Sequence, residues 1–176
     1  MGRGLRSLAV ALGFMALAAG SGAIGQEAWH TLTGPDSSFT ADLPAAPKYT
    51  PTQVKTASGS MYTAHQYVLA KADVVYTVHS ARYPDDINVS NARVSLQGGL
   101  DALAKGMEGG KWTSVDWVTH QGLPAVDAVG VRASQTIRSY SVLKGRQNVT
   151  LTYAGPAGSA RSADVDRFVA SLRLGP

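Results

Sequence analysis

The sequence contains no cysteine. This absence excludes disulfides, thiol nucleophiles, CxxC redox chemistry, cysteine-ligated zinc and iron–sulfur clusters. It also leaves no residue that could be acylated to form a lipoprotein anchor. A domain of this composition has to be held together by burial of apolar surface alone.

Charge is also scarce, since Lys, Arg, Asp and Glu together make up 16% of the chain. The formal net charge is +4, and two of the arginines, Arg3 and Arg6, lie at the extreme N-terminus. No run of Lys and Arg is present that would neutralise successive phosphates, so nucleic acid is not expected as a partner.

The first residues have the pattern of a secretory signal. Arg3 and Arg6 precede an apolar run from Leu8 to Ala19, and Ala23-Ile24-Gly25 fits a small-x-small cleavage site. The run is shorter than the roughly 20 apolar residues that span a bilayer. We therefore expect residues 1–25 to be a signal peptide cleaved near Gly25/Gln26, and residues 26–176 to form a single periplasmic or secreted domain. The alternative is an uncleaved segment that tethers the protein to the membrane.

Short stretches rich in Val, Thr and Tyr predict strands along the rest of the chain. The clearest is a hairpin of residues 61–70 and 73–82, with Lys71-Ala72 at its tip. In that register Leu69 pairs with Val74, Tyr67 with Tyr76 and His65 with Val78. The face shared by Leu69, Tyr67, Tyr76, Val74 and Val78 is the better candidate for the core. The other expected strands are residues 29–32, 38–43, 53–57, 111–119, 124–133, 136–143 and 147–154, and an extended proline-containing passage links the second to the third.

Two helices are expected from apolar residues spaced three or four apart. The first begins at Ser90 or Asn91 and ends at Gly109-Gly110, with Gly98-Gly99 marking a close approach to the sheet or a late start. The second begins near Ser162. Their apolar stripes are Leu96, Leu100, Leu103 and Met107 in the first, and Val165, Phe168, Val169 and Leu172 in the second.

This order of elements predicts an α+β fold: a mostly antiparallel sheet of about six to eight strands with two main helices packed on it. The helices either cover the two faces of the sheet, giving three layers, or share one face.

Several local motifs accompany this order. Residues 39–47 read FTADLPAAP, residues 122–125 read GLPA, and residues 168–174 read FVASLRL. Arg138 and Tyr140 lie in one strand and Leu151 and Tyr153 in the next. Over residues 29–174 the chain resembles exported bacterial proteins of the PsbP-like α/β/α sandwich class, in a branch without a known role. The resemblance implies an accessory or binding role rather than catalysis. No functional motif of the class matches, so the resemblance assigns no site residue.

Candidate chemical groups are dispersed. His30, His65, His79 and His120 lack the local spacing of metal ligands, and the expected register puts His65 and His79 on opposite faces. A three-residue loop would place these two on one face. We predict no metal site and no cofactor.

Carboxylates and serines give equally weak signals. Asp85 and Asp86 are adjacent in a turn, where neighbouring carboxylates usually diverge into water. Asp116 and Asp127 lie in strands and are expected to face solvent, with burial opposite an arginine as the alternative. Ser141 and Lys144 match SxxK, but residues three apart on a strand face opposite sides. Ser159 lies in a glycine-rich loop rather than a nucleophile elbow, and Gly106 to Gly110 is expected to end a helix rather than cradle a phosphate.

Trp112 and Trp117 are five residues apart and therefore predicted to face opposite sides of a regular strand, one in the core and one exposed. An exposed Trp near tyrosines would suit a partner or a glycan.

Together these observations predict an exported accessory or binding domain that acts through a surface or a groove between the sheet and a helix. The expected partner is an envelope protein, a small apolar ligand or a cell-wall component. No catalytic, cofactor-binding or metal residue is predicted, and the binding residues are not specified by the sequence. The alternatives are a hydrolase with a site assembled from dispersed loops, and the membrane-tethered protein described above.

Overall fold

The computed structural model describes residues 28–107 and 109–176. The predicted signal peptide, its cleavage site and the expected first residue of the domain, Gln26, lie outside the described residues. No helix among the described residues is both long enough and apolar enough to span a bilayer.

The main sheet has seven antiparallel strands in the order β3-β4-β5-β9-β8-β7-β6. Strands β6 to β9 form a meander, and β9 joins this meander to the rest of the sheet by pairing with β5. This arrangement confirms the expected α+β fold with a mostly antiparallel sheet. The strands are β3 (Lys48–Lys55), β4 (Met61–Lys71), β5 (Val74–Arg82), β6 (Lys111–His120), β7 (Leu123–Arg132), β8 (Gln135–Lys144) and β9 (Gln147–Pro156).

A smaller sheet lies beside the main one. It consists of β1 (His30–Thr33), β2 (Phe39–Leu43) and β10 (Arg173–Leu174) in the order β1-β2-β10, so the two ends of the described chain meet on β2. A short 3₁₀ turn, η1 (Pro35–Ser37), joins the first two strands, and a second, η2 (Ser159–Arg161), follows β9.

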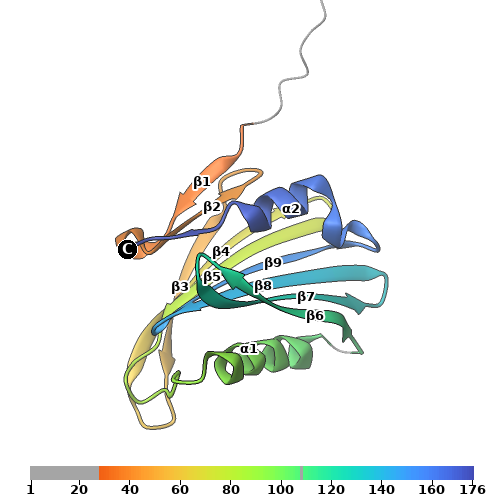
Figure 1. The fold of residues 1–176 in the computed structure, drawn as a ribbon. Helices are drawn as coiled ribbons and strands as arrows, with labels where there is room; N and C mark the ends of the chain where they lie inside the picture. The colour runs from red at the N-terminus through yellow and green to blue at the C-terminus, as the bar shows by residue number, and fades with distance from the viewer. Residues whose placement is uncertain (1–27, 108) are drawn as a thin grey trace, which may run out of the picture.

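The two α-helices cover opposite faces of the main sheet, which decides between the two expected arrangements (Figure 1). Helix α1 (Ala92–Gly106) begins at Asn91, whose side-chain oxygen accepts a hydrogen bond from the Val94 amide at 3.1 Å. Helix α2 (Ala163–Ala170) begins after Ser162, as expected.

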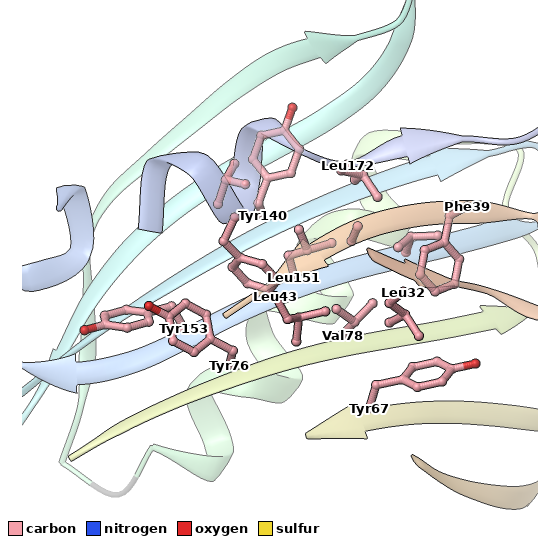
Figure 2. Packing of buried hydrophobic residues seen from close by; sticks show 14 of the residues in the cluster. Leu32, Phe39, Leu43, Tyr67, Tyr76, Val78, Tyr140, Leu151, Tyr153 and Leu172 are labelled. Carbon is pink, nitrogen blue, oxygen red and sulfur yellow. The ribbon is translucent and has the colours of Figure 1, made fainter. Parts of the chain in front are cut away.

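The larger core lies between α2, the small sheet and the main sheet (Figure 2). Tyr67, Tyr76 and Val78 of the predicted hairpin face are buried in it, and the ring of Phe168 from α2 packs edge-on against Tyr76 at 5.2 Å. The second core is small and lies under α1, where Leu96 and Leu100 pack on Val126, Ala128 and Leu143. Helix α1 is therefore held over one part of the sheet by few side chains.

In the hairpin of β4 and β5, each residue of β4 pairs with the residue two positions further along β5 than predicted. Lys71 pairs with Val74, so the turn is Ala72-Asp73 rather than Lys71-Ala72, and Leu69 pairs with Tyr76. Ala72 takes up the left-handed backbone that the turn needs, with φ of 51°. A shift of two residues preserves the alternation of a strand, so the predicted core face is correct.

Three further expectations need correction. Strand β3 starts at Lys48 and includes Pro51, which an edge strand tolerates because its missing N–H need not join a ladder. Helix α1 ends at Gly106, before Gly109-Gly110. Gly98 and Gly99 do not mark a late start of the helix, since they lie in the middle of α1. They do not mark a close approach of the helix to the sheet either, since a Cβ at either position would meet nothing within 4 Å.

Candidate binding groove

A groove of about 480 Å³ lies between α1 and the half of the sheet that α1 leaves uncovered. Helix α1 packs on β7 and β8, whereas the groove floor is built mainly from β4, β5 and β9. Its volume is within the range of small-molecule sites. It is lined by Gln66, Thr77, His79, Tyr83, Ser95, Leu96, Gly99, Ala102, Leu103, Ser141, Asn148, Thr150 and Thr152.

The floor of the groove consists of polar side chains in two rows that cross the strands. Strand pairing aligns Gln66, His79, Thr150 and Ser141 in one row. Strand pairing aligns Thr77 and Thr152 in the other row, which continues beneath α1 to the buried Ser139 outside the groove. A sheet face that packs against a helix is ordinarily apolar, because burying an unpaired polar group costs free energy. The α1 side of β5 and β9 is instead rich in threonine.

The opposite wall is the apolar side of α1. It presents Leu96, Leu103 and Ala102, together with the bare backbone of Gly99 and with Ser95, whose hydroxyl donates to the Asn91 carbonyl at 3.2 Å. Two contacts with β6 also hold the helix in place. The Trp112 indole donates to the Leu100 carbonyl at 3.3 Å, and the Arg93 guanidinium lies 4.5 Å from the Trp117 ring centre.

The groove contains no Asp, Glu, Lys or Arg. Its one imidazole, His79, has a lowered pKa, because burial and secondarily the nearby His65 disfavour the protonated ring. Beneath the helix, the fully buried hydroxyl of Ser139 has no hydrogen-bond partner among the described residues. The groove is thus polar on one side, apolar on the other, and uncharged.

A second and more open cleft, of about 780 Å³, lies near the far end of β4 and β5. It contains Arg146, which forms an ion pair with Asp85 at 3.4 Å and donates to the carbonyls of Tyr83 and Ile87. These bonds tie the arginine to the loop that leads into α1. We regard this cleft as the weaker candidate, because it is more open and because Arg146 in it is already engaged in holding that loop.

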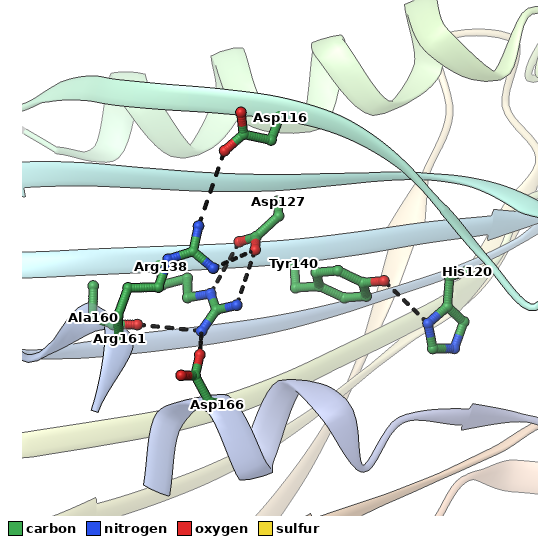
Figure 3. Close-up of polar contacts among 8 residues, drawn as sticks. All are labelled: Asp116, His120, Asp127, Arg138, Tyr140, Ala160, Arg161 and Asp166. Atoms are coloured by element: carbon green, nitrogen blue, oxygen red, sulfur yellow. Dashed lines mark hydrogen bonds and ion pairs between the residues drawn. The ribbon is translucent and has the colours of Figure 1, made fainter. Parts of the chain in front are cut away.

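The face opposite α1 carries a buried charge cluster (Figure 3). Arg138, 5% exposed, donates to both carboxylate oxygens of Asp127 at 3.0 and 2.9 Å and to Asp166 at 2.6 Å. Arg161 donates to Asp127 at 2.7 Å and lies 4.0 Å from Asp116. The expectation that Asp127 faces solvent is wrong, and the alternative of burial opposite an arginine is correct. Asp116 remains well exposed.

Burial by itself raises the pKa of Asp127. The hydrogen bonds and charges of Arg138 and Arg161 together outweigh that effect and hold the pKa below its ordinary value of 3.8. The same ion pairs raise the pKa of Arg138 against its own burial. Every member of the cluster is used in joining β7 and β8 to α2 and η2, so the cluster is a structural one.

The four histidines considered in the sequence analysis do not come together in one site. His65 and His79 lie on opposite faces, as expected, and His30 is exposed. The His65 ring bonds to the Tyr49 hydroxyl at 2.8 Å, and His120 bonds to Tyr140 at 3.0 Å, as Figure 3 shows. Within residues 28–107 and 109–176 no group of three or more His, Asp or Glu residues is arranged to hold a metal.

Carboxylates and serines are likewise engaged separately. Asp86 accepts hydrogen bonds from Thr56 and Ser58, which lower its pKa. Ser159 bonds to the Tyr153 hydroxyl at 2.7 Å. Ser141 lines the groove, whereas Lys144 points to the other face and donates to the Gly175 carbonyl, so the SxxK match is not a catalytic pair.

The two tryptophans differ from expectation. A bulge in β6 between Trp112 and Ser114 shifts the register by one residue, so Trp112 and Trp117 lie on the same face. Both pack, half-buried, against the core under α1. Neither is the exposed aromatic that the sequence suggested.

Comparison with known proteins places the fold. No protein-family model matches the chain, and no curated protein matches its sequence. The solution structure of cyanobacterial PsbP (CyanoP) from Synechocystis sp. PCC 6803 does match, with a TM-score of 0.55 and 11% identity, over 88% of this chain and 96% of that one. The chain therefore has a PsbP-like fold, as its sequence resemblance indicated.

Proposed function

We propose that this protein is an exported, non-catalytic binding domain, and that the groove between α1 and the uncovered part of the sheet holds a small amphipathic ligand. The observation that carries the proposal is the two-sided lining of that groove. An apolar helix wall faces a polar, uncharged sheet floor across a space of about 480 Å³. Small-molecule sites typically combine apolar walls with a few convergent polar groups.

Two further observations support the proposal. The leader pattern of residues 1–25 favours export. The PsbP-like fold agrees with an accessory or binding role, since that is what the resembled class implies, although fold alone does not assign function. The hydrolase alternative has no specific observation in its favour: no Ser–His hydrogen bond is present in the described part of the chain, where the bonded histidines contact tyrosines.

Octyl glucoside, an uncharged molecule with a sugar head and an apolar chain, is a suitable probe below its micelle-forming concentration. In ¹⁵N NMR titrations of the full chain, the shifted amides are expected to be those of Thr77, Thr152 and Ala102. Gly99→Leu should abolish these saturable shifts, because its side chain would project from the groove wall.

Gly98→Leu is the matched control. It makes the same change one residue earlier, at a glycine that does not line the groove. It should bind octyl glucoside as the wild type does. Shifts that map to another surface, or that survive Gly99→Leu unchanged, would contradict the proposal.

A further inference from the structure

We infer that the ligand of the groove under α1 is an uncharged saccharide. This inference rests on the proposed function and specifies the ligand's chemical class. It begins from the absence of charge: a bound anion or cation would lose its water in the groove without gaining an opposite charge, and such burial is costly. A neutral ligand incurs no such cost.

The chemistry of the floor narrows the class further. Threonine and serine hydroxyls and the glutamine amide each provide both donors and acceptors. Saccharide hydroxyls also donate and accept, and they are borne on successive ring carbons. Neighbouring strands are about 4.8 Å apart, so each row presents a hydrogen-bonding group at that interval across the sheet. The floor is thus a regular array suited to a ligand that carries many hydroxyls.

Several of these floor groups are available to a ligand. Ser141 bonds to Thr150 at 2.8 Å, and Thr150 to Asn148 at 3.0 Å. The side chains of Thr77, Thr152 and Gln66, in contrast, bond to no other side chain or backbone group among the described residues. A purely apolar ligand would cover them without replacing their bonds to water, at a cost of about 1–3 kcal/mol for each buried group left unpaired. The floor therefore disfavours acyl chains.

The helix wall complements the other side of a sugar ring. The C–H face of a pyranose is apolar and flat. Gly99 and Ala102 leave room beside the helix backbone, since a Cβ on Gly99 would meet nothing within 4 Å. Tyr83 adds an aromatic side chain to the groove lining. A ring standing edge-on to the floor, with one C–H face against α1, would thus direct the hydroxyls of its lower edge toward β5 and β9.

The test is an NMR titration of the ¹⁵N-labelled full chain with maltotriose, cellotriose and tri-N-acetylchitotriose. Trigalacturonate serves as the charged counterpart and 1-octanol as the apolar one. At least one neutral trisaccharide should give saturable shifts at Thr77, Thr152 and Ala102. The double variant Thr77→Val/Thr152→Val keeps the shape of the floor but removes two hydroxyls, and it should weaken that binding by about tenfold or more.

Thr63→Val is the matched control. It makes the same change on β4, on the face away from the groove, and should leave saccharide binding unchanged. If octyl glucoside shifts the groove amides but, of the other probes, only 1-octanol or only trigalacturonate does so, the saccharide inference is wrong and the proposed function stands. If the double variant binds the trisaccharide as tightly as the wild type, the inference is also wrong. If no probe, octyl glucoside included, shifts those amides, both fail.

Discussion

At the scale of single residues, the contrast between the two faces of the sheet is the most informative feature. Arg138 on β8 faces α2 and is fully engaged by Asp127 and Asp166, whereas its neighbour Ser139 faces α1 with an unpartnered hydroxyl. The α2 face thus satisfies its charged groups internally, although the buried Nε2 of His120 on that face also has no hydrogen-bond partner among the described residues. The α1 face leaves polar groups unused, which is what a binding surface requires and a core does not.

The buried carboxylate of Asp127 should make the protein sensitive to acid. Its pKa lies below 3.8 in the fold, so the folded state binds fewer protons than the unfolded state as the pH falls. Its stabilising contribution is therefore complete above about pH 4 and is lost as the pH drops through the lowered pKa. Asp127→Asn should reduce the unfolding free energy by about 3 kcal/mol at pH 7 and flatten its decline below pH 4.

Urea denaturation followed between pH 7 and pH 2 measures both effects. Asp101→Asn is the control, since Asp101 is exposed on α1 and bonded only by Gln97, and a change within about 0.5 kcal/mol is expected there. If Asp127→Asn retains the wild-type decline below pH 4, the ion-pair assignment fails.

At the scale of elements, α1 combines a good N-cap with a weakened middle. Asn91 caps it, and Leu96 and Leu100 anchor it, but Gly98 and Gly99 interrupt its helix-forming sequence. Neither glycine is required by packing, and neither has positive φ. The structure explains Gly99 as part of the groove wall, whereas nothing in the structure explains Gly98.

Gly98→Ala should therefore stabilise the protein. Alanine in a helix interior is favoured over glycine by about 1 kcal/mol, and the added methyl group would meet no neighbour. Chemical denaturation should show an increase of that size with an unchanged dependence on denaturant. Ala104→Gly on the same helix provides the reverse change and should lower stability by a comparable or larger amount. A loss of stability in Gly98→Ala would show that Gly98 has a contact absent from this structure.

Strand β6 shows where pattern reading reaches its limit. Alternation along a regular strand predicts that Trp112 and Trp117 face opposite sides of the sheet. The bulge after Trp112 turns every later side chain of β6 to the other face, so the two tryptophans share one face. A bulge is decided by how an edge strand fits its neighbour and the helix below, and the sequence KWTSVDW gives no turn or glycine signal for it. The groove wall depends on this bulge, because both tryptophans help to position α1.

At the scale of the whole molecule, the two ends of the described domain meet in the small sheet, where β2 pairs with both β1 and β10. Strand β1 lies on the side of the molecule that holds the small sheet and α2, whereas α1 lies on the other side of the main sheet, as Figure 1 shows.

The leader itself gives a direct prediction. Intact-mass spectrometry of the protein recovered from the cell envelope or medium of an exporting host should find a chain that starts at Gln26. Gly25→Arg places a long charged side chain at the cleavage site and should block processing, whereas Gln26→Asn should not. A wild-type product that starts at Met1 or Gly2 would favour the membrane-tethered alternative.

The sequence by itself determined the local features: two helices with apolar stripes, tight antiparallel hairpins, and the core face of β4 and β5. These follow from periodicity and turn chemistry within a few residues, and they survive an error of two residues in register. Only the tertiary structure decided that the helices lie on opposite faces, that β9 pairs with β5, and that Asp127 meets Arg138. Only the tertiary structure showed that α1 leaves the polar face of β5 and β9 uncovered. These outcomes depend on contacts between distant segments, whose energies no local pattern encodes.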